Sequence, residues 1–485
     1  MGFNGDKEPD IDLNFSGEYQ SRAHNFIKEM FGADYTFRAG TISAYQEKNA
    51  IGVVKKYAEM HEQVYSTANI LRLASGICGV KRTTGQHPGG IVVIPKERDI
   101  YDFTPIQYPA DNTDSSMYTT HFDFNSLHDT ILKFDCLGHD APTQLKRLKD
   151  FTDIDFLTLP MNDPQVMSLY KDTSALKLSE PDVQKVGCLG LPEQGTIMAR
   201  GMIVETKPSS FYDLVQLAGL SHGTNVWNGN ARDLINDGIC NIDQVIGCRD
   251  SIMTTLINYN LPSKMAFDIM EKVRKGKGLS EEQIAKMREC QVPEWYIDSC
   301  LKIQYLFPKA HAVAYVMSAL RIAWYKVYRK EAFYAVWLGN NIDEFNAELI
   351  IGKSLAEIRK SKEYYFTDLN KRNPREKKLF YILEIVEEMM LRGVQLLPID
   401  LYKSDAKLFL PEGKNVRPPF AVIPKFPQTT AENIVKARKN GEFLAREDLA
   451  VKADVKQAAM EALANFHVLD NLPEQNQMDL TDLLG

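Results

Sequence analysis

The sequence lacks the features of a membrane protein or of a disulfide-bonded secreted protein. Its longest apolar run, 312–325, is interrupted by Ser318 and Arg321 and is shorter than the roughly 20 residues that span a bilayer. The amino terminus has no apolar signal region. The seven cysteines never form a Cys-x-x-Cys pair, which indicates buried, reduced thiols rather than a disulfide framework or a structural zinc site. We therefore expect a cytoplasmic protein without a membrane partner.

The sequence also lacks an excess of positive charge, a long repeat and low-complexity segments. Its 485 residues are 44% hydrophobic and 25% charged, an ordinary composition for a chain of several domains. The net charge of -7 argues against wholesale polyanion binding, although a nucleic-acid enzyme needs only a local basic channel. Composition therefore leaves the function open.

The hydrophobic pattern predicts a small sheet interrupted by helices and followed by a long helical part. Strict alternation predicts a strand at 10–15, and buried apolar runs predict strands at 89–95 and 130–137. A helical pattern lies between about 17 and 80. Beyond Pro142 we expect mainly helices, at 243–258, 262–275, 280–290, 294–305, 310–329 and 355–392, then a Pro-rich turn at 417–420, two short helical hairpins and a polar tail. The predicted fold class is α+β and predominantly helical.

Three aspartates form the sharpest chemical pattern. Because residues two apart on a strand share a face, Asp10 and Asp12 should point together, away from the apolar side chains between them. The same spacing places Lys133 and Asp135 together on a second strand. Carboxylates this close repel one another unless cations lie between them, and magnesium prefers such oxygen ligands. We predict two magnesium ions about 4 Å apart that serve phosphoryl transfer; for an Asp-x-Asp pair alone, a solvent-facing strand is the simpler alternative.

Two basic stretches are candidate phosphate contacts. Residues 273–278 follow a helix and combine three cations with glycines. Residues 305–315 open a helix with Lys309 and His311 near its amino-terminal end, where an anion is favoured, and Tyr305 could stack a base. A solvated loop and a core helix are the simpler interpretations of these stretches taken singly.

Residues 81–90 predict a basic, hydroxyl-rich loop that could bind a sugar-phosphate backbone, although many such loops are merely turns. Ser221 and His222 suggest a nucleophile and its base. Adjacent residues rarely face each other productively, so we reject a serine hydrolase.

Taken together, six stretches resemble the PolC-type DNA polymerase III alpha subunits. They occur in family order across nearly the whole chain. Six motifs in this order are a far more specific signal than any single motif. The stretches are PDIDLNFSGEYQ (9–20), KRTTGQHPGG (81–90), LKFDCLGHD (132–140), GLSHGT (219–224), VRKGKGL (273–279) and PEWYIDSC (293–300).

The resemblance implies a DNA-directed DNA polymerase in which a primer 3′ hydroxyl attacks a deoxynucleoside triphosphate (dNTP). Its palm, of the nucleotidyltransferase beta kind, would hold two magnesium ions on Asp10, Asp12 and Asp135, with Lys133 near the reacting phosphate. The implied parts are a partial palm at 1–15 and 85–140, a thumb at 16–84, fingers at 141–374, tandem helix-hairpin-helix motifs at 375–470 and a clamp-binding-like tail at 471–485. The family's exonuclease and the opening of its palm are missing from this sequence.

The resemblance also implies binding residues and partners. Nucleotide contacts would come from Arg249, Arg274, Lys277, Tyr305, Lys309 and His311. DNA contacts would come from Lys81, Arg82, Thr83, His87 and Lys425, and weak sliding-clamp contacts from Gln477, Met478 and Leu480. The implied partners are primer-template DNA, the clamp, other replisome subunits and the missing amino-terminal half of the polymerase.

The hairpin at 423–435 departs from the family. Lys425 and Pro427 stand where glycines make the tight turn, and proline also removes a backbone donor. Two alternatives to a polymerase stay open: a non-catalytic DNA-binding and clamp-binding remnant, and a metal-dependent phosphodiesterase, for which we identify no general base.

Overall fold

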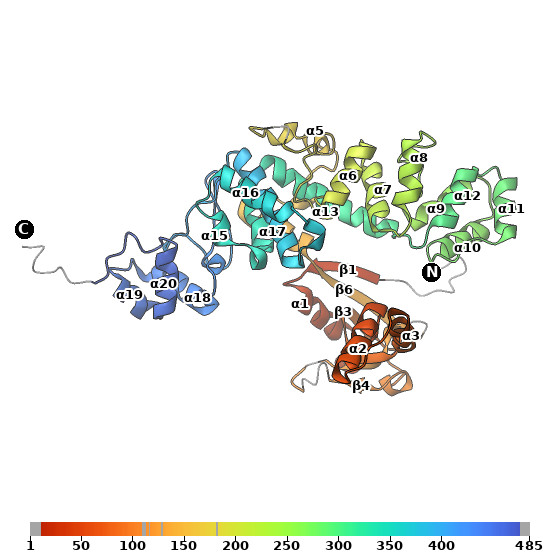
Figure 1. Ribbon diagram of the computed structural model, residues 1–485, viewed down its shortest axis with the longest axis horizontal. Helices are drawn as coiled ribbons and strands as arrows, with labels where there is room; N and C mark the ends of the chain where they lie inside the picture. Colours follow the sequence, from red (N-terminus) through yellow and green to blue (C-terminus); the bar gives the residue numbers. More distant parts are fainter. Residues whose placement is uncertain (1–10, 109–112, 116, 128–129, 181–182, 476–485) are drawn as a thin grey trace, which may run out of the picture. The chain divides into compact units, whose positions relative to one another are not determined.

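The computed structural model describes residues 11–108, 113–115, 117–127, 130–180 and 183–475 and contains two compact units, Met1–Thr143 and Gln144–Gly485 (Figure 1). Among the helices in these ranges, none has both the length and the apolar character needed to cross a bilayer. All seven cysteines are free thiols, but the prediction that they are buried holds for five of them, Cys136, Cys188, Cys240, Cys248 and Cys300, whereas Cys78 is exposed and Cys290 is half-buried.

The first unit is built on a six-stranded mixed sheet with the strand order β1-β6-β3-β2-β5-β4. β1 pairs with β6, and β2 with β5, in parallel; the other neighbours are antiparallel. The strands are β1 Ile11–Ser16, β2 Thr36–Ala44, β3 Lys81–Val93, β4 Ile106–Gln107, β5 Thr119–Asp123 and β6 Leu132–His139. The strands predicted at 10–15 and 130–137 are confirmed as β1 and β6, which lie side by side.

Each face of the sheet carries its own apolar cluster, because side chains alternate along a strand. One face packs Cys136 against Ile27 of α1 (Gln20–Phe31). The opposite face packs Val92 against apolar side chains from the segment between β3 and β6. Val92 is the register partner of Lys133, so Lys133 shares that opposite face. The predicted division of β6 into an apolar and a charged face is therefore correct.

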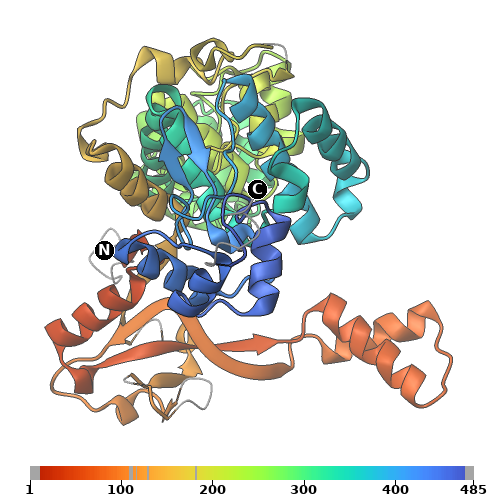
Figure 2. The same ribbon diagram turned by 90° about the vertical axis from the view of Figure 1, so that its left-hand side faces the viewer.

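Beyond the sheet, β2 and β3 continue as a two-stranded ribbon that carries a helical hairpin (Figure 2). The hairpin consists of α2 (Glu47–Met60) and α3 (Thr67–Ile77), which share a small apolar core around Val54 and Ala74. In Figure 2 this hairpin lies at the end of the ribbon that is remote from the sheet.

Two predictions about this unit are wrong. Residues 17–80 are not helical throughout, because Thr36–Ala44 forms β2 inside the sheet. Residues 81–90 are not a loop but the first part of β3. Lys81–Gly85 is exposed on both faces of the ribbon, so hydrophobic alternation, the usual sequence signal of a strand, is absent there.

The second unit is mainly helical, as predicted. The helical stretches expected beyond residue 243 are confirmed with two differences: the first begins later, at Arg249, and the stretch expected at 355–392 is two helices, because the chain leaves the α-helix at 367–373 before Pro374 opens the second. The helices after α3 are α4 Asp140–Thr152, α5 Pro164–Ser168, α6 Ile197–Thr206, α7 Phe211–His222, α8 Arg232–Asn236, α9 Arg249–Asn258, α10 Ser263–Val273, α11 Glu281–Glu289, α12 Glu294–Lys302, α13 Lys309–Tyr328, α14 Lys330–Asn340, α15 Ala347–Ile350, α16 Leu355–Phe366, α17 Pro374–Leu391, α18 Gln428–Ala437, α19 Arg446–Lys452 and α20 Gln457–Asn465, and a small hairpin pairs β7 Leu410–Glu412 with β8 Asn415–Arg417.

The core of this unit contains a fully buried ion pair. Lys326 of α13 and Glu388 of α17 are both 0% exposed, and Nζ lies 2.9 Å from Oε1. Lys326 also donates to the carbonyl oxygens of Gly187 and Leu189, and the Tyr334 hydroxyl donates to Glu388. Burial lowers the pKa of Lys326, while Glu388 acts in the opposite direction. The pair thus ties three helices to the segment at 187–189.

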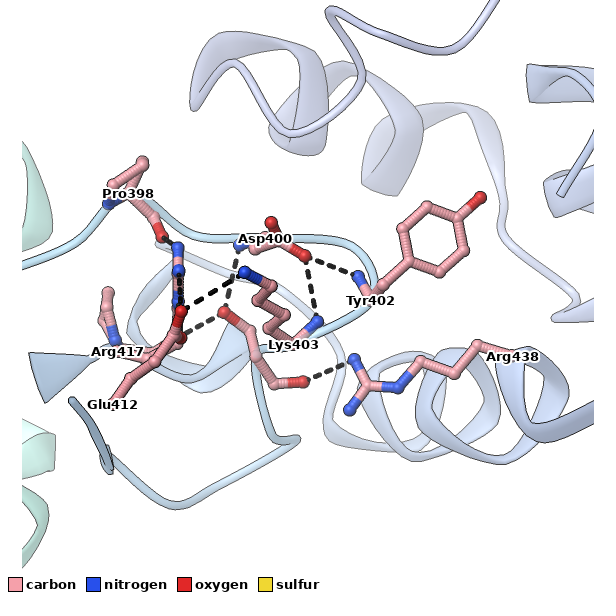
Figure 3. Close-up of polar contacts among 9 residues, drawn as sticks. Pro398, Asp400, Tyr402, Lys403, Glu412, Arg417 and Arg438 are labelled. Atoms are coloured by element: carbon pink, nitrogen blue, oxygen red, sulfur yellow. Dashed lines mark hydrogen bonds and ion pairs between the residues drawn. The ribbon is translucent and has the colours of Figure 1, made fainter. Parts of the chain in front are cut away.

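A polar network ties the β7–β8 hairpin to the helices that follow it (Figure 3). Arg417 donates to both oxygens of Glu412 and to the Pro398 carbonyl oxygen, and Arg438 donates to the Ser404 carbonyl oxygen at 2.7 Å. The Arg417 guanidinium lowers the pKa of Glu412 to about 2 from 4.5. The stabilising contribution of this pair is therefore complete above about pH 4.5 and is lost as the pH falls toward 2.

Candidate active site

The pairing of β1 with β6 brings Asp12 and Asp135 together. Their Cα atoms are register partners on adjacent parallel strands. Register partners in neighbouring strands point to the same face of a sheet, so the two carboxylates project from one surface. Asp10 lies outside the described residues, and its place beside them remains a prediction.

Lys133 stands next to these carboxylates on the same strand face. Its Nζ lies 2.7 Å from Oδ2 of Asp135 and 4.1 Å from the centre of the Phe124 ring. The ammonium group therefore offsets part of the negative charge of the pair. One oxygen of Asp135 is engaged in this contact.

The other oxygen of Asp135, Oδ1, is buried without a hydrogen-bond donor among the residues that the structure describes. The nearby Nδ1 of His87, at 3.4 Å, accepts a hydrogen bond from the Gly90 amide at 2.8 Å, so the neutral ring cannot donate to Asp135 through that atom. Burial lowers the pKa of His87, against the opposing effect of Asp135. Because a neutral His87 does not donate to Oδ1 of Asp135, that oxygen can bind another positively charged partner.

A divalent cation fits this arrangement. An orphaned buried carboxylate oxygen beside a second carboxylate is an oxygen donor set of the kind that magnesium prefers. Within the described ranges, no group of three or more His, Cys, Asp or Glu side chains is arranged to hold a metal. Asp12 and Asp135 would thus have to share the ion with further ligands.

The glycines that follow His87 allow β3 to approach its two neighbouring strands. A Cβ atom added to Gly89 would lie 2.9 Å from the Cys136 carbonyl oxygen. One added to Gly90 would lie 2.8 Å from Cβ of Ala39 and 2.9 Å from Nδ1 of His87. Glycine at these positions therefore fixes both the strand spacing and the place of the His87 ring beside Asp135.

We expect Gly90→Ala to lower the free energy of unfolding by about 1–3 kcal/mol, because the new methyl group must displace Ala39 or the His87 ring. Denaturant unfolding measures this change. The matched control is Gly85→Ala on the same strand, where a Cβ would meet only the Thr41 hydroxyl, at 3.2 Å. Its expected effect is within about 0.5 kcal/mol. Equal losses in the two variants would show that the close approach at Gly90 is unimportant.

In the second unit, the residues expected to contact a nucleotide gather around the segment 304–311. The Arg249 amide donates to the Phe307 carbonyl oxygen at 3.1 Å. The Leu306 amide lies 3.4 Å from the Arg274 carbonyl oxygen, and a Cβ on Gly276 would clash with the segment at Gln304. The loop that carries Arg274 and Lys277 therefore lies against this segment.

Tyr305, Lys309 and His311 belong to the segment itself. The Tyr305 ring is 45% exposed, and its backbone forms an isolated bridge with Thr224. The His311 ring stacks edge to face on Phe307 at 5.8 Å. Five of the six residues expected to bind a nucleotide therefore lie in or against the segment 304–311. The sixth, Lys277, is on the loop that packs against the same segment.

Two of the expected phosphate contacts already have intramolecular partners. Arg274 makes two hydrogen bonds to the Glu271 carboxylate, at 2.6 and 2.8 Å. The Lys309 amide at the start of α13 donates to Asp250 at 2.8 Å, so a carboxylate occupies the place expected for an anion. The i,i+3 spacing of Glu271 and Arg274 could have revealed the first pair. No local pattern signals the second, because Asp250 lies on another helix.

The residues expected to contact DNA in the first unit lie at two places on β3, its beginning and its middle. Lys81, Arg82 and Thr83 are exposed on the ribbon, where Arg82 stacks over Tyr45 at 5.5 Å. His87 lies beside Asp135. Since a strand rises about 3.3 Å per residue, His87 is roughly 20 Å from Lys81. His87 therefore belongs to the aspartate site and not to the basic cluster.

Lys425, at a position where the resemblance implies a glycine, has a backbone conformation that favours glycine. Its φ of 59° is left-handed, and Pro427 forms the N-cap of α18. The tight turn is thus retained, at a conformational cost of about 1 kcal/mol, but Pro427 offers no N–H group. Gln477, Met478 and Leu480 lie outside the described residues.

Three family models match the chain. The bacterial DNA polymerase III alpha NTPase domain matches residues 1–68 and 54–138, and the bacterial DNA polymerase III alpha subunit finger domain matches 141–292. A helix-hairpin-helix motif matches 393–478.

Curated relatives cover nearly all of the chain. A protein named DNA polymerase III PolC-type from Oceanobacillus iheyensis is 50% identical over 99% of the chain and 34% of its own length. The proteins of the same name from Bacillus subtilis and Thermotoga petrophila are 50% and 48% identical over 99% of the chain, which covers 33% and 35% of them. The chain thus spans about a third of the length of these relatives.

Proposed function

This chain belongs to the PolC-type DNA polymerase III family, and from that premise we propose that it is a catalytic part of a DNA-directed DNA polymerase. It transfers a nucleotide from a dNTP to the 3′ hydroxyl of a primer. The observation that carries this proposal is the register pairing of Asp12 with Asp135, whose buried Oδ1 has no donor among the described residues.

In this proposal Asp12 and Asp135, together with Asp10, hold two magnesium ions. Bound magnesium stabilises the attacking and leaving oxygens of an in-line displacement. Lys133 holds Oδ2 of Asp135 and lies near the reacting phosphate. His87, whose Nδ1 accepts from the Gly90 amide, lies beside the unpaired oxygen and neither donates to it nor neutralises it.

The nucleotide is bound by the cluster around the segment 304–311. Tyr305 offers an exposed ring to the base or sugar, and Arg249, Lys277, Lys309 and His311 offer positive or donor groups to the phosphates. Arg274 contributes only if its guanidinium leaves Glu271.

We assign the proposed palm to the six-stranded sheet and the proposed thumb to the ribbon with α2 and α3. This assignment moves the first part of β2, residues 36–40, from the thumb expected at 16–84 into the palm, because it pairs with β5 inside the sheet, whereas residues 41–44 belong to the ribbon. The fingers span 141–374 and the helix-hairpin-helix motifs 375–470, with Lys425 approaching DNA phosphates. The proposed partners are primer-template DNA, a sliding clamp reached through 471–485, other replisome subunits and an amino-terminal half of the polymerase, all in the cytoplasm.

Magnesium-dependent primer extension tests this function. The chain is assayed alone and together with the part of the Bacillus subtilis relative that it does not match. We expect nucleotide incorporation that requires magnesium in at least one of the two arrangements. Salt-sensitive duplex binding without incorporation in either arrangement would identify a non-catalytic DNA-binding remnant instead. Cleavage of unprimed DNA would identify a phosphodiesterase.

A further inference from the structure

His222 at the end of α7 is held by acceptors at both ring nitrogens. Nδ1 lies 2.7 Å from the Ala218 carbonyl oxygen, and Nε2 lies 3.2 Å from the Glu193 carboxylate. Neither a carbonyl nor a carboxylate oxygen can donate a hydrogen bond, so both nitrogens must carry protons to make these contacts. The geometry therefore corresponds to an imidazolium cation.

The surroundings of the ring also favour a positive charge. The His222 ring stacks on Phe307 with centroids 4.6 Å apart and planes 23° apart, which places a cation over an aromatic face. The carboxyl end of α7 carries a partial negative charge. The hydrogen bond that His222 donates to Glu193 raises the pKa of His222 above its usual value, against the opposing effect of burial.

These contacts exclude the hydrolase role considered from the sequence. Ser221 Oγ does lie 2.9 Å from Nδ1 of His222, closer than expected for adjacent residues. However, Nδ1 directs its proton to Ala218, so it cannot accept one from Ser221. The ring is consequently a link between segments rather than a base.

The loop that carries Glu193 is packed against Tyr170 and Ile385. Glu193 has a left-handed φ of 61°, a strained conformation that persists only when its surroundings enforce it. The buried Tyr170 hydroxyl donates to Gln194 at 2.6 Å, and Gly190 lies so close to Ile385 that a Cβ would approach its Cδ1 to 2.6 Å. These contacts therefore hold the Glu193 carboxylate in a fixed position beside the His222 ring.

We propose that His222 is a positioning residue for nucleotide binding: as an imidazolium it joins the Glu193 loop to Phe307 and thereby holds Tyr305 and His311 in place. The inference rests on the proposed function, since it assigns a nucleoside triphosphate to the segment 304–311. Loss of the proton removes the Glu193 contact and the cation over Phe307 together. The segment then loses this side-chain support, while its backbone hydrogen bonds to Thr224, Arg249 and Arg274 remain.

Among the residues that the structure describes, titratable side chains approach the ring from the Glu193 loop and from α13. Glu193 faces it from the loop, and Tyr315 faces it from α13 at 6.2 Å between ring centroids. His311, also on α13, contacts Phe307 at 5.8 Å and Tyr315 at 6.3 Å. Of these side chains, Glu193 is the one whose charged group accepts a hydrogen bond from His222. Removing the Glu193 charge should therefore shift the titration midpoint of His222 most.

The test combines a titration of His222 with dNTP binding. In an NMR titration, the His222 Cε1–H signal is assigned by its absence from His222→Gln. We expect its midpoint to lie above the usual histidine value and to fall in Glu193→Gln. The dNTP affinity of the full chain is measured at about pH 7 and about pH 9, and the change seen in His222→Gln is the part that comes from the triphosphate and from other groups of the protein.

Wild-type affinity should fall roughly tenfold between the two pH values, the effect of losing one charge-assisted contact. His222→Gln should bind roughly tenfold more weakly at the lower pH and show no such fall. His467→Gln is the matched control, because His467 forms an exposed pair with Asp470. It should behave as wild type.

The outcomes separate this inference from the proposed function. Wild-type binding that is independent of pH and is retained in His222→Gln overturns the positioning role, while the nucleotide site stands. A chain that binds no dNTP at either pH overturns the proposed site and this inference with it. A His222 midpoint at or below the usual value overturns the imidazolium assignment whatever the binding shows.

Discussion

Asp135→Asn is expected to lower the rate of primer extension by at least about 1,000-fold. The change removes the negative charge of the Asp135 carboxylate. Its Oδ1 is buried without a hydrogen-bond donor among the described residues, and its Oδ2 contacts Lys133. An amide oxygen is a neutral and weaker magnesium ligand than a carboxylate, and losing metal stabilisation of the transition state costs several kcal/mol. About 4 kcal/mol corresponds to the predicted factor. Single-turnover incorporation at saturating dNTP measures it.

The control for this variant is Asp34→Asn, which removes an exposed carboxylate from the same unit. It should extend primers at the wild-type rate. Circular dichroism and denaturant unfolding establish that Asp135→Asn is folded, and salt-dependent duplex binding should remain, because the phosphate contacts are elsewhere. Undiminished extension by Asp135→Asn would remove this residue from the catalytic site.

Lys326→Met is expected to lower the free energy of unfolding by about 3–5 kcal/mol. The ammonium group is fully buried and donates to Glu388 and to the carbonyl oxygens of Gly187 and Leu189. Methionine fills a similar volume but leaves the Glu388 charge without its cation and two carbonyl groups without a donor, which is the costly way to break a buried pair. Denaturant unfolding followed by circular dichroism measures the loss.

The double variant Lys326→Met with Glu388→Met separates charge from packing. It removes the uncompensated carboxylate, so we expect at least about 2 kcal/mol of the loss to return. Lys353→Met is the surface control, because Lys353 lies 3.9 Å from Glu357 in an exposed pair, and it should leave the unfolding midpoint nearly unchanged. A single variant as stable as wild type would show that the pair contributes nothing to the fold.

The sequence was most informative where one face of an element is buried. β1 and β6 could be predicted because apolar residues alternate with Asp12, Lys133 and Asp135. The first part of β3 could not, since the ribbon is exposed on both faces and offers no such alternation. β2 was missed for a different reason: its first residues are buried on both faces, so they too lack a period of two.

Contacts between distant segments were beyond the reach of the sequence. Lys326 falls in a predicted core helix, but its partner Glu388 stands in the stretch 355–392, which the sequence indicated only as charged helix. The contact between Glu193 and His222 depends on the left-handed backbone of the Glu193 loop, which no sequence pattern predicts. The register of β1 and β6, by contrast, brought together carboxylates that the spacing within each strand had already placed on one face.

Strand β3 runs without interruption from Lys81, beside the α2–α3 hairpin, to Gly90, the register partner of Asp135. Its ladder with β2 is broken between Gln86 and Ile91, where four residues of β3 face a single residue of β2. Such a bulge bends a strand, so β3 changes direction at 87–90, the stretch that contains His87. The ribbon with its hairpin and the section that pairs with Asp135 are therefore two differently directed parts of one strand, joined by the backbone at His87.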